Sequence, residues 1–530
     1  MSVYPHSHLF VGPSETVVIS GPHIQVLSTT TGDILHSTVN FEDEKRGAVI
    51  ESGPVRCAAV DKSNKYLITT AEDKMLKLWE IGGLKLLSER ELPKKPTGLA
   101  FRADSQKLLT SDKFGDIFSY PFTYVPLTVK QKRDALSSHE NPSSGQLILG
   151  HASPLNAFLL TSDEKYIVTA DRDEHIRVSW YPQGYNIEMY CLGHLKFVSA
   201  IHIPHLDPSM LISGGGDPVL KIWDWMAGDL KHEVNVLDTI DPYMAVRALK
   251  RKRGEGEEGE EGEGKKRKKG KGKDKAKEET PDTGTPVAEG SEAAAEEKTE
   301  EAAKGEPSEP EKILVIHKID SLDAEGCLWI VFSAVGTTAL FTFPFKAGVT
   351  SSDIRAFDFG LPVIDFSITG DGEIWVNLDA QWKSTDLATS EASTKAVRVM
   401  HFVSQELKEV SEKALVSALN TKSLLQATPE ELKKLDLYGD LTSMPKYSDS
   451  EAAEATPEVA AGGEKAKSKK ELGRLKNKTK VLAKMAVSAA TGDARAGEDE
   501  LEEPETKRTK SEHGDEAEVK KNEDVVMAES

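Results

Sequence analysis

The sequence predicts an all-β fold, a seven-bladed β-propeller with a disordered charged insertion and a disordered C-terminal tail. Three observations predict it. A unit of strand, short polar turn and strand recurs along the chain, and the apolar residues of its strands alternate with polar ones. Two segments, 249–311 and 448–530, consist mainly of charged and small residues. Such segments bury too little apolar surface to offset the entropy lost on ordering, so we expect both to stay unfolded.

Length and composition leave room for several domains. The chain has 530 residues, a net charge of -20 and a hydrophobic fraction of only 38%. Cys57, Cys191 and Cys327 are far apart and form no C-x-x-C pair, which argues against a zinc site or a disulfide framework and fits a reduced intracellular compartment. The first residues, MSVYPHSHLFVGPSE, lack the basic start and apolar core of a secretory signal.

One uncharged stretch, CLWIVFSAVGTTALFTFPF at 327–345, is long enough to suggest a membrane span. Gly336, Thr337 and Thr338 divide it into two runs rich in β-formers, and Pro344 closes the second run. We therefore expect a buried hairpin and no membrane contact.

The repeat is clearest in YLITTAEDKMLKLWE (66–80), YIVTADRDEHIRVSW (166–180) and MLISGGGDPVLKIWD (210–224). Each stretch has an apolar strand, a polar turn that ends in Asp, and an alternating second strand. A Ser or Thr stands four positions before the Asp, and a Trp stands six positions after it in two of the three. The second and third stretches follow Gly-His pairs.

This arrangement resembles the WD-repeat pattern of propeller blades, in which His, Ser or Thr, the turn Asp and Trp share one hydrogen-bond network. The blade of 191–235 is complete, whereas that of 147–190 has Ser179 at the Trp position and that of 51–90 has Pro54 at the His position. The residues that the pattern assigns to the network are Thr69, Asp73 and Trp79; His151, Thr169 and Asp173; and His194, Ser213, Asp217 and Trp223.

The other blades follow from length and alternation. Residues 99–122 fit a blade with Lys113 at the Asp position, and 15–35 supply an N-terminal one. Residues 236–248 with 312–350 form a blade interrupted by the insertion, and 354–403 form the last. Seven is a normal number of blades, and ring closure removes exposed sheet edges.

The predicted domain organisation is a propeller over 1–405, interrupted at 249–311, then a short helical extension at 406–447 and the tail at 448–530. In the extension, Thr428 and Glu431 have capping-box spacing and Pro429 takes the first helical position. This predicts a short helix near 429–437.

The sequence indicates no catalytic residue, no cofactor and no metal ligand. GEGEEG (254–259) matches a dinucleotide-binding pattern by letter, but no apolar strand precedes it and no amphipathic helix follows. We find no nucleophile elbow and no zinc pattern.

The stretch TADRDEHIRVSWY (169–181) is crowded with charged residues and suggests acid–base chemistry or a metal site. The repeat alignment instead assigns Asp173 to bracing of the blade. The turn with Arg172 and the loop GHLKF (193–197) should emerge on one face of a propeller, so Arg172, Arg177 and Lys196 would form an outward-facing basic patch beside acids. This composition suits an ion-paired protein contact better than proton transfer. The residues alone leave a partner contact and a merely solvated surface equally open.

Two basic clusters lie in the charged insertion and predict nuclear localisation, with RNA contact or a solvated charge run as the alternatives. They consist of Lys250, Arg251, Lys252 and Arg253, and of Lys265, Lys266, Arg267, Lys268 and Lys269.

The stretches TADRDEHIRVSWYP, CLGHLKFVSAIHIP and LISGGGDPVLKIWDW carry a closer resemblance. The chain resembles the non-catalytic WD-repeat subunit of the eukaryotic tRNA (guanine-N7-)-methyltransferase in its fungal form. The resemblance implies a heterodimer with a Rossmann-type catalytic subunit that binds S-adenosylmethionine and methylates N7 of a guanine in the tRNA variable loop. The propeller would keep that subunit active and contact tRNA indirectly or weakly.

By the same resemblance, Arg177 would pair with an acid of the methyltransferase, with Arg172 and Lys196 as neighbours. The rival interpretation is a generic nuclear WD-repeat adaptor in ribosome biogenesis or ubiquitin ligation. An enzyme in its own right would rest only on the charged stretch.

Overall fold

The computed structural model describes residues 2–131, 141, 143–248, 313–382, 395–410 and 413–445, all of which fall in one compact unit, Met1–Ala453. The expected insertion at 249–311, its two basic clusters and the tail at 448–530 lie outside the described residues.

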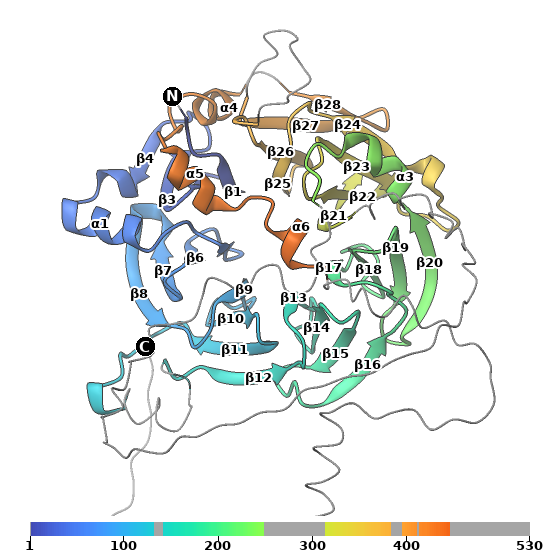
Figure 1. The fold of residues 1–530 in the computed structure, drawn as a ribbon, viewed down its shortest axis with the longest axis horizontal. Helices are drawn as coiled ribbons and strands as arrows, with labels where there is room; N and C mark the ends of the chain where they lie inside the picture. The colour runs from blue at the N-terminus through green and yellow to red at the C-terminus, as the bar shows by residue number, and fades with distance from the viewer. Residues whose placement is uncertain are drawn as a thin grey trace, which may run out of the picture. The chain divides into compact units, whose positions relative to one another are not determined.

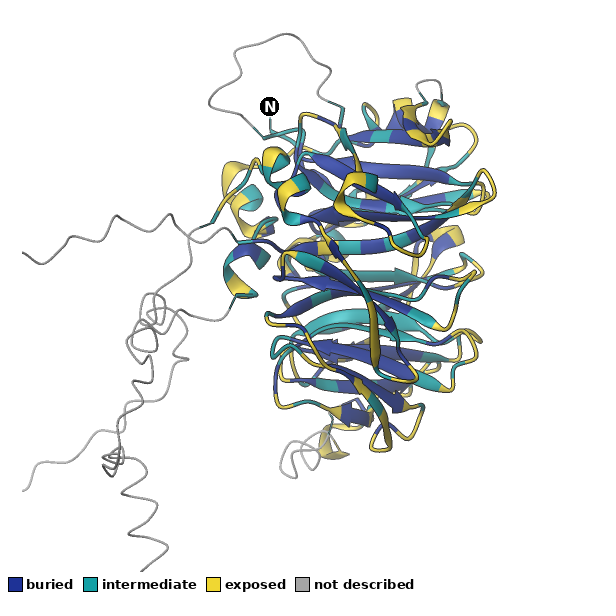
Figure 2. Cartoon of the chain, turned by 90° about the vertical axis from the view of Figure 1, so that its right-hand side faces the viewer, coloured by how far each residue is buried: buried dark blue, intermediate teal, exposed yellow. Residues whose placement is uncertain are grey.

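Seven four-stranded antiparallel sheets form a ring, which confirms the seven-bladed β-propeller (Figure 1). The first strand of each blade lines the centre and the fourth lies at the rim. Apolar side chains pack between neighbouring blades: Val168 and Ile176 of the fourth blade, for example, belong to one buried cluster with Leu211 and Trp223 of the fifth. In side view the strands are largely buried and the loops at both ends are exposed (Figure 2).

The first four blades run from His6 to Cys191. The first contains β1 (His6–Val11), β2 (Glu15–Ser20), β3 (His23–Ser28) and β4 (Ile34–Ser37). The second contains β5 (Cys57–Val60), β6 (Tyr66–Thr70), β7 (Met75–Glu80) and β8 (Lys85–Glu91). The third contains β9 (Pro96–Phe101), β10 (Lys107–Asp112), β11 (Asp116–Pro121) and β12 (Gln146–Gly150). The fourth contains β13 (Leu155–Leu160), β14 (Tyr166–Asp171), β15 (Ile176–Trp180) and β16 (Ile187–Cys191).

The last three blades complete the ring. The fifth contains β17 (Val198–His202), β18 (Met210–Gly215), β19 (Val219–Asp224) and β20 (Asp229–Asn235). The sixth contains β21 (Ile316–Ala324), β22 (Cys327–Ala334), β23 (Ala339–Pro344) and β24 (Arg355–Asp358). The seventh contains β25 (Val363–Ile368), β26 (Glu373–Leu378), β27 (Val397–Val403) and β28 (Glu406–Glu409).

The helices are short and lie in the connections between strands, between blades or after the last blade. The α-helices are α1 (Asp43–Glu51), α3 (Leu237–Ile240), α4 (Ala414–Leu419), α5 (Pro429–Leu435) and α6 (Asp440–Ser443), and the 3-10 helices are η1 (Thr38–Asn40), η2 (Ile81–Gly83), η3 (Asp241–Tyr243) and η4 (Ser351–Asp353). Helix α5 confirms the predicted capping box, because the Glu431 amide donates to Thr428 Oγ1 at 3.3 Å and the Thr428 amide donates to Glu431 Oε2 at 2.8 Å.

Several limits of the predicted blades were wrong. Residues 146–150 pair with β11 in the third blade rather than opening the fourth, and residues 406–409 pair with β27 in the seventh blade rather than opening the helical extension. The first blade begins at His6 rather than at 15, and residues 355–358 pair with β23 in the sixth blade instead of opening the seventh. Residues 236–248, expected to form part of the interrupted blade, hold α3 and η3 and meet that blade through the isolated bridge of Met244 with Thr337. Pro242 cannot donate to a sheet and lies at the start of η3.

The uncharged stretch 327–345 forms the buried hairpin predicted for it, as β22 and β23 pair over Phe332 and Phe341. In the part of the chain that the structure describes, no helix has the length and apolar character needed to cross a membrane.

Candidate functional site

The fifth blade holds the four-residue network that the WD-repeat pattern implies. His194 lies between an acid and a hydroxyl, with Nδ1 2.6 Å from Asp217 Oδ2 and Nε2 2.7 Å from Ser213 Oγ. Trp223 Nε1 donates to the same Ser213 Oγ at 2.8 Å. Burial raises the pKa of Asp217, but the hydrogen bond and charge of His194 and the amide of Leu195 outweigh it and hold this pKa below its usual value. The network fixes the loop that carries His194 to the turn that carries Asp217.

In the fourth blade the network uses a different acid from the one predicted. His151 Nε2 lies 2.8 Å from Thr169 Oγ1, and Nδ1 lies 3.0 Å from Asp171 Oδ2. Asp171 Oδ1 also accepts the amides of Asp173 and His175 at 2.9 and 3.0 Å. Asp171 therefore braces this turn, and the assignment of that role to Asp173 was wrong.

A glycine explains why the two blades differ. The position two residues after the network hydroxyl is Asp171 in the fourth blade but Gly215 in the fifth. A Cβ on Gly215 would lie 1.9 Å from the Phe197 carbonyl oxygen, so no side chain fits there and the acid stands two residues later. The sequence contained a signal for this, since the third blade also has an acid two positions after the corresponding residue, at Asp112.

The second blade keeps half of the network. Trp79 Nε1 donates to Thr69 Oγ1 at 3.0 Å. Because Pro54 offers no imidazole, Asp73 instead accepts the Met75 amide at 3.0 Å and pairs with Lys77 at 3.2 Å. Asp73 thus braces its own turn without a histidine.

The structure buries Arg177, so the prediction that it faces outward was wrong. Only 8% of the residue is exposed, because it lies in the middle of β15 between Thr169 on β14 and Tyr190 on β16. Its Nη1 donates to the Gly150 carbonyl at 3.1 Å, and its buried Nε has no hydrogen-bond partner among the described residues. Burial lowers the pKa of the guanidinium, and Tyr190 and the charge of Asp171 only partly counter this.

Arg177 differs from its counterparts in what lies across from it. Lys77 faces Glu89 and Lys221 faces Glu233, and both lysines form ion pairs with those acids. In the fourth blade an extra residue in the hairpin shifts the register, and Tyr190 takes the position of the acid. Within the described part of the chain, Arg177 is a buried cation that no carboxylate pairs with.

Arg172 and Lys196 lie at the same end of the blades as Arg177, as the repeat alignment predicted. The register Ile176–Cys191 places the β14–β15 turn beside the connection from β16 to β17. Arg172 donates its amide to the Pro154 carbonyl at 3.0 Å and is half-buried, as is Lys196. Their role in binding a partner stays a prediction.

Exposed apolar side chains border these cations. Leu192 is 61% exposed, Leu195 85% and Tyr190 38%, all on or next to the connection that carries His194. Large apolar residues at such exposure mark protein contact sites when they gather around a few buried polar groups. We call Arg172, Arg177, Tyr190, Leu192, Leu195 and Lys196 the candidate surface.

The candidate surface has the composition of a docking site. No group of three or more His, Cys, Asp or Glu side chains that could hold a metal occurs among the described residues. A buried unpaired cation within an apolar border can accept one carboxylate of a partner and bury the surface around it.

Comparison with known proteins decides the family. The model described as "tRNA methyltransferase TRM82 WD40 domain" matches residues 38–145 and 127–403. The chain belongs to this family. Similar TRM82 proteins carry the name "tRNA (guanine-N(7)-)-methyltransferase non-catalytic subunit". They include those of Aspergillus clavatus, 38% identical over 36% of this chain and 50% of the relative, and of Aspergillus oryzae, 39% identical over 34% and 46%.

A more distant TRM82 relative, from Eremothecium gossypii, is 34% identical over 36% of this chain and 41% of its own length. The chain thus spans half or less of the length of these curated relatives.

Proposed function

We propose that this chain is the non-catalytic subunit of a tRNA (guanine-N7-)-methyltransferase, as the names of its relatives suggest. It binds a separate S-adenosylmethionine-dependent catalytic subunit through the candidate surface. Binding lowers the population of inactive conformers of that subunit, which is a population shift, and so permits N7-methylguanosine formation in the tRNA variable loop.

One observation carries the location of the contact: Arg177 is buried opposite Tyr190, where the second and fifth blades place an acid opposite a lysine. A buried cation without a carboxylate is unfavourable in the isolated chain. A carboxylate on a partner removes that penalty only when it docks at this point, so the pair fixes the register of the complex.

The affinity itself should come mainly from apolar contact. Leu192 is 61% and Leu195 85% exposed, and burying their apolar surface against a partner is favourable by about 25 cal/mol per Å² before the losses of association. The ion pair at Arg177 then supplies specificity at the centre of the interface, from which the surrounding apolar contacts exclude water.

Arg177→Glu tests the proposal. We expect it to abolish co-purification with the catalytic subunit and tRNA methylation by the mixture, because it places two carboxylates against each other. The matched control is Lys165→Glu, the same change of charge at the opposite end of the fourth blade, where the lysine side chain is 74% exposed and pairs with Asp163. The control should bind normally.

Unchanged binding by Arg177→Glu would refute the candidate surface as the site of the contact. A large loss of thermal stability in this variant would show that Arg177 stabilises the fold rather than the complex. Mass spectrometry of the proteins captured by the full chain distinguishes the proposal from the rival interpretation of a generic WD-repeat adaptor. A stoichiometric methyltransferase supports the proposal, whereas a cullin adaptor or a set of preribosomal proteins supports the rival interpretation.

We propose a nuclear location from the clusters Lys250–Arg253 and Lys265–Lys269 in the sequence. A fluorescent fusion in which both clusters are replaced by Ser should leave the nucleus. A fusion that stays nuclear would contradict the assignment, and replacement of the exposed Lys45, Lys62 and Lys65 provides the control for lost charge.

A further inference from the structure

The chain after the last blade crosses one face of the propeller. We call residues 413–445 the strap. Its helix α4 lies at the junction of the seventh and first blades, and α5 and α6 continue over the centre until α6 lies next to β17 of the fifth blade (Figure 1). The side view places these helices on a single face of the ring (Figure 2).

The first helix of the strap, α4, packs into the hydrophobic core. Leu415 and Leu419 of α4 are buried with Leu9 of β1 and Val399 of β27, so α4 packs across the junction of the first and seventh blades. His6 Nε2 also donates to the Leu419 carbonyl at 2.9 Å.

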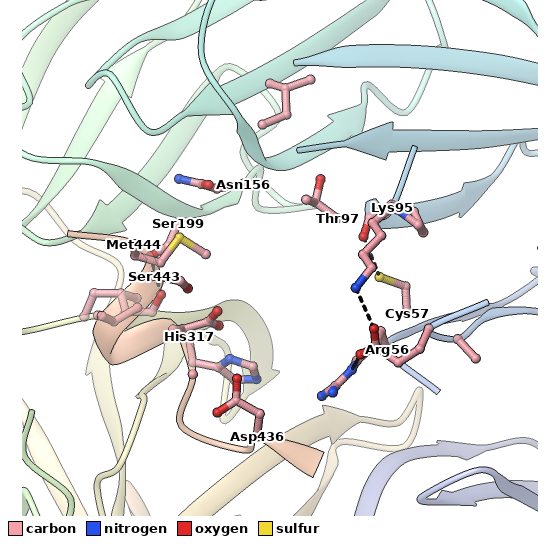
Figure 3. A pocket seen from close by; sticks show the side chains of 18 residues that line it. Arg56, Cys57, Lys95, Thr97, Asn156, Ser199, His317, Asp436, Ser443 and Met444 are labelled. Atoms are coloured by element: carbon pink, nitrogen blue, oxygen red, sulfur yellow. Dashed lines mark hydrogen bonds and ion pairs between the residues drawn. The ribbon is translucent and has the colours of Figure 1, made fainter. Parts of the chain in front are cut away.

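In its middle the strap borders a cavity rather than a packed core. Arg56 donates to the carbonyls of Lys434, at 2.6 Å, and Leu435, and so holds the end of α5. Beyond this point the strap forms one wall of a cavity of about 510 Å³, where Asp436 and Ser443 face Lys95 and Thr97 across the opening (Figure 3).

The strap regains apolar contact at its end, in α6. Leu441 is 2% exposed and clusters with Phe197, Val315 and Val335 of the fifth and sixth blades. Tyr438 donates its hydroxyl to Asp379 at 2.7 Å just before this contact. Leu441 is therefore the buried residue through which the strap joins this cluster, and Tyr438 and Met444 pack against it as partly buried residues.

Phe197 belongs to the loop of the candidate surface. Its carbonyl accepts the Gly216 amide at 3.0 Å, and its ring lies where a side chain on Gly216 would be, 2.7 Å from the ideal Cβ. At the other end of the loop, Asp217 accepts the Leu195 amide at 3.2 Å. The loop is thus held at His194 by the blade and at Phe197 partly by the strap, with Leu195 and Lys196 between these two points.

We propose that Leu441 is a positioning residue for partner binding: by covering Phe197 it fixes the conformation in which the 193–197 loop presents Leu195 and Lys196. A loop ordered before docking loses less entropy on binding, so the strap raises affinity without touching the partner. This inference rests on the proposed function, because the partner it names is the catalytic subunit.

Leu441→Ala and Leu435→Ala separate positioning from general stability. Both remove a buried leucine from the strap, but Leu435, 6% exposed on α5, lies outside the Phe197 cluster. Calorimetric titration of each full-length variant with the separately purified catalytic subunit should show about 10-fold weaker binding for Leu441→Ala, a size typical of coupling between two sites, and little change for Leu435→Ala. Leu441→Met should restore binding because it refills the contact.

Hydrogen exchange supplies a readout that a merely structural role would not move. The Leu195 and Lys196 amides should exchange faster in Leu441→Ala than in Leu435→Ala at equal thermal stability. If Leu441→Ala does not fold, the smaller truncation Leu441→Val replaces it, with a smaller effect in the same direction.

Equal affinity for both leucine variants, or unchanged exchange in the loop, would overturn the inference. Arg177→Glu is titrated alongside as a reference. If the wild-type chain does not bind the catalytic subunit, the proposed function fails, and if Arg177→Glu binds like the wild type, the candidate surface fails. If Arg177→Glu abolishes binding and Leu441→Ala does not weaken it, only the role of the strap fails.

Discussion

Arg177 lies directly across the β15–β16 pair from Tyr190, whereas the corresponding Lys221 of the fifth blade lies across from Glu233 and forms an ion pair with it. The fifth blade thus pairs its strand cation with an acid of its own, whereas the fourth blade places no acid opposite Arg177. The difference arises from one extra residue in the β15–β16 hairpin, but a single substitution at Tyr190 can place an acid opposite Arg177.

Tyr190→Glu should therefore weaken partner binding at the candidate surface without destabilising the blade. The new carboxylate would pair with Arg177, as Glu233 does with Lys221, and would repel the acid expected on the partner. We expect at least a tenfold loss of affinity for the catalytic subunit with unchanged or higher thermal stability. Tyr190→Gln is the control, since it removes the same ring without adding charge; equal affinities of the two variants would speak against an electrostatic cause.

The network of the fifth blade was predictable because its members stand at fixed spacings within one repeat. Asp171 was not found, because the choice between it and Asp173 depends on whether a side chain fits beside the carbonyl at the Phe197 position, which is a contact across strands. The missing acid opposite Arg177 depends on the register of β16, because the β15–β16 hairpin is one residue longer than the hairpins that pair Lys77 with Glu89 and Lys221 with Glu233. The contact of Leu441 with Phe197 joins positions far apart in the chain, and no periodicity signals it.

A matched pair of serines tests the network in the fourth and fifth blades. Ser213 Oγ is bonded to both His194 and Trp223, so Ser213→Ala leaves two buried polar groups unpaired and should lower the free energy of unfolding by about 1–3 kcal/mol. Ser179 stands at the Trp position of the fourth blade, and its buried Oγ has no partner among the described residues. Ser179→Ala should be neutral or stabilising. Urea unfolding measures both, and a destabilised Ser179→Ala would indicate an ordered water at that hydroxyl.

Gly215→Ala tests the close approach of two backbones. The added Cβ would meet the Phe197 carbonyl oxygen at 1.9 Å, so β17 or β18 must shift. We expect a loss of several kcal/mol, at the large end for a single substitution, and weaker binding of the catalytic subunit because the 193–197 loop moves. Gly83→Ala, where a Cβ has nothing within 4 Å, is the control and should be neutral or slightly stabilising. A Gly215→Ala protein with the melting temperature of the control would contradict the steric account.

Asp217→Asn should make the stability of the propeller less sensitive to acid. In the folded chain, burial raises the pKa of Asp217, but His194 and the Leu195 amide lower it by more than burial raises it. The folded pKa therefore lies below the unfolded one. Such a carboxylate contributes stability that is present above its unfolded pKa, about 3.9, and is lost as the pH falls through the folded pKa. The difference in unfolding free energy between wild type and Asp217→Asn should therefore be about 1–3 kcal/mol at pH 7 and should shrink progressively below about pH 4. Chemical unfolding of both proteins across this range measures it, and a difference that stays constant with pH would mean that Asp217 acts through its shape and hydrogen bonds, not through its charge.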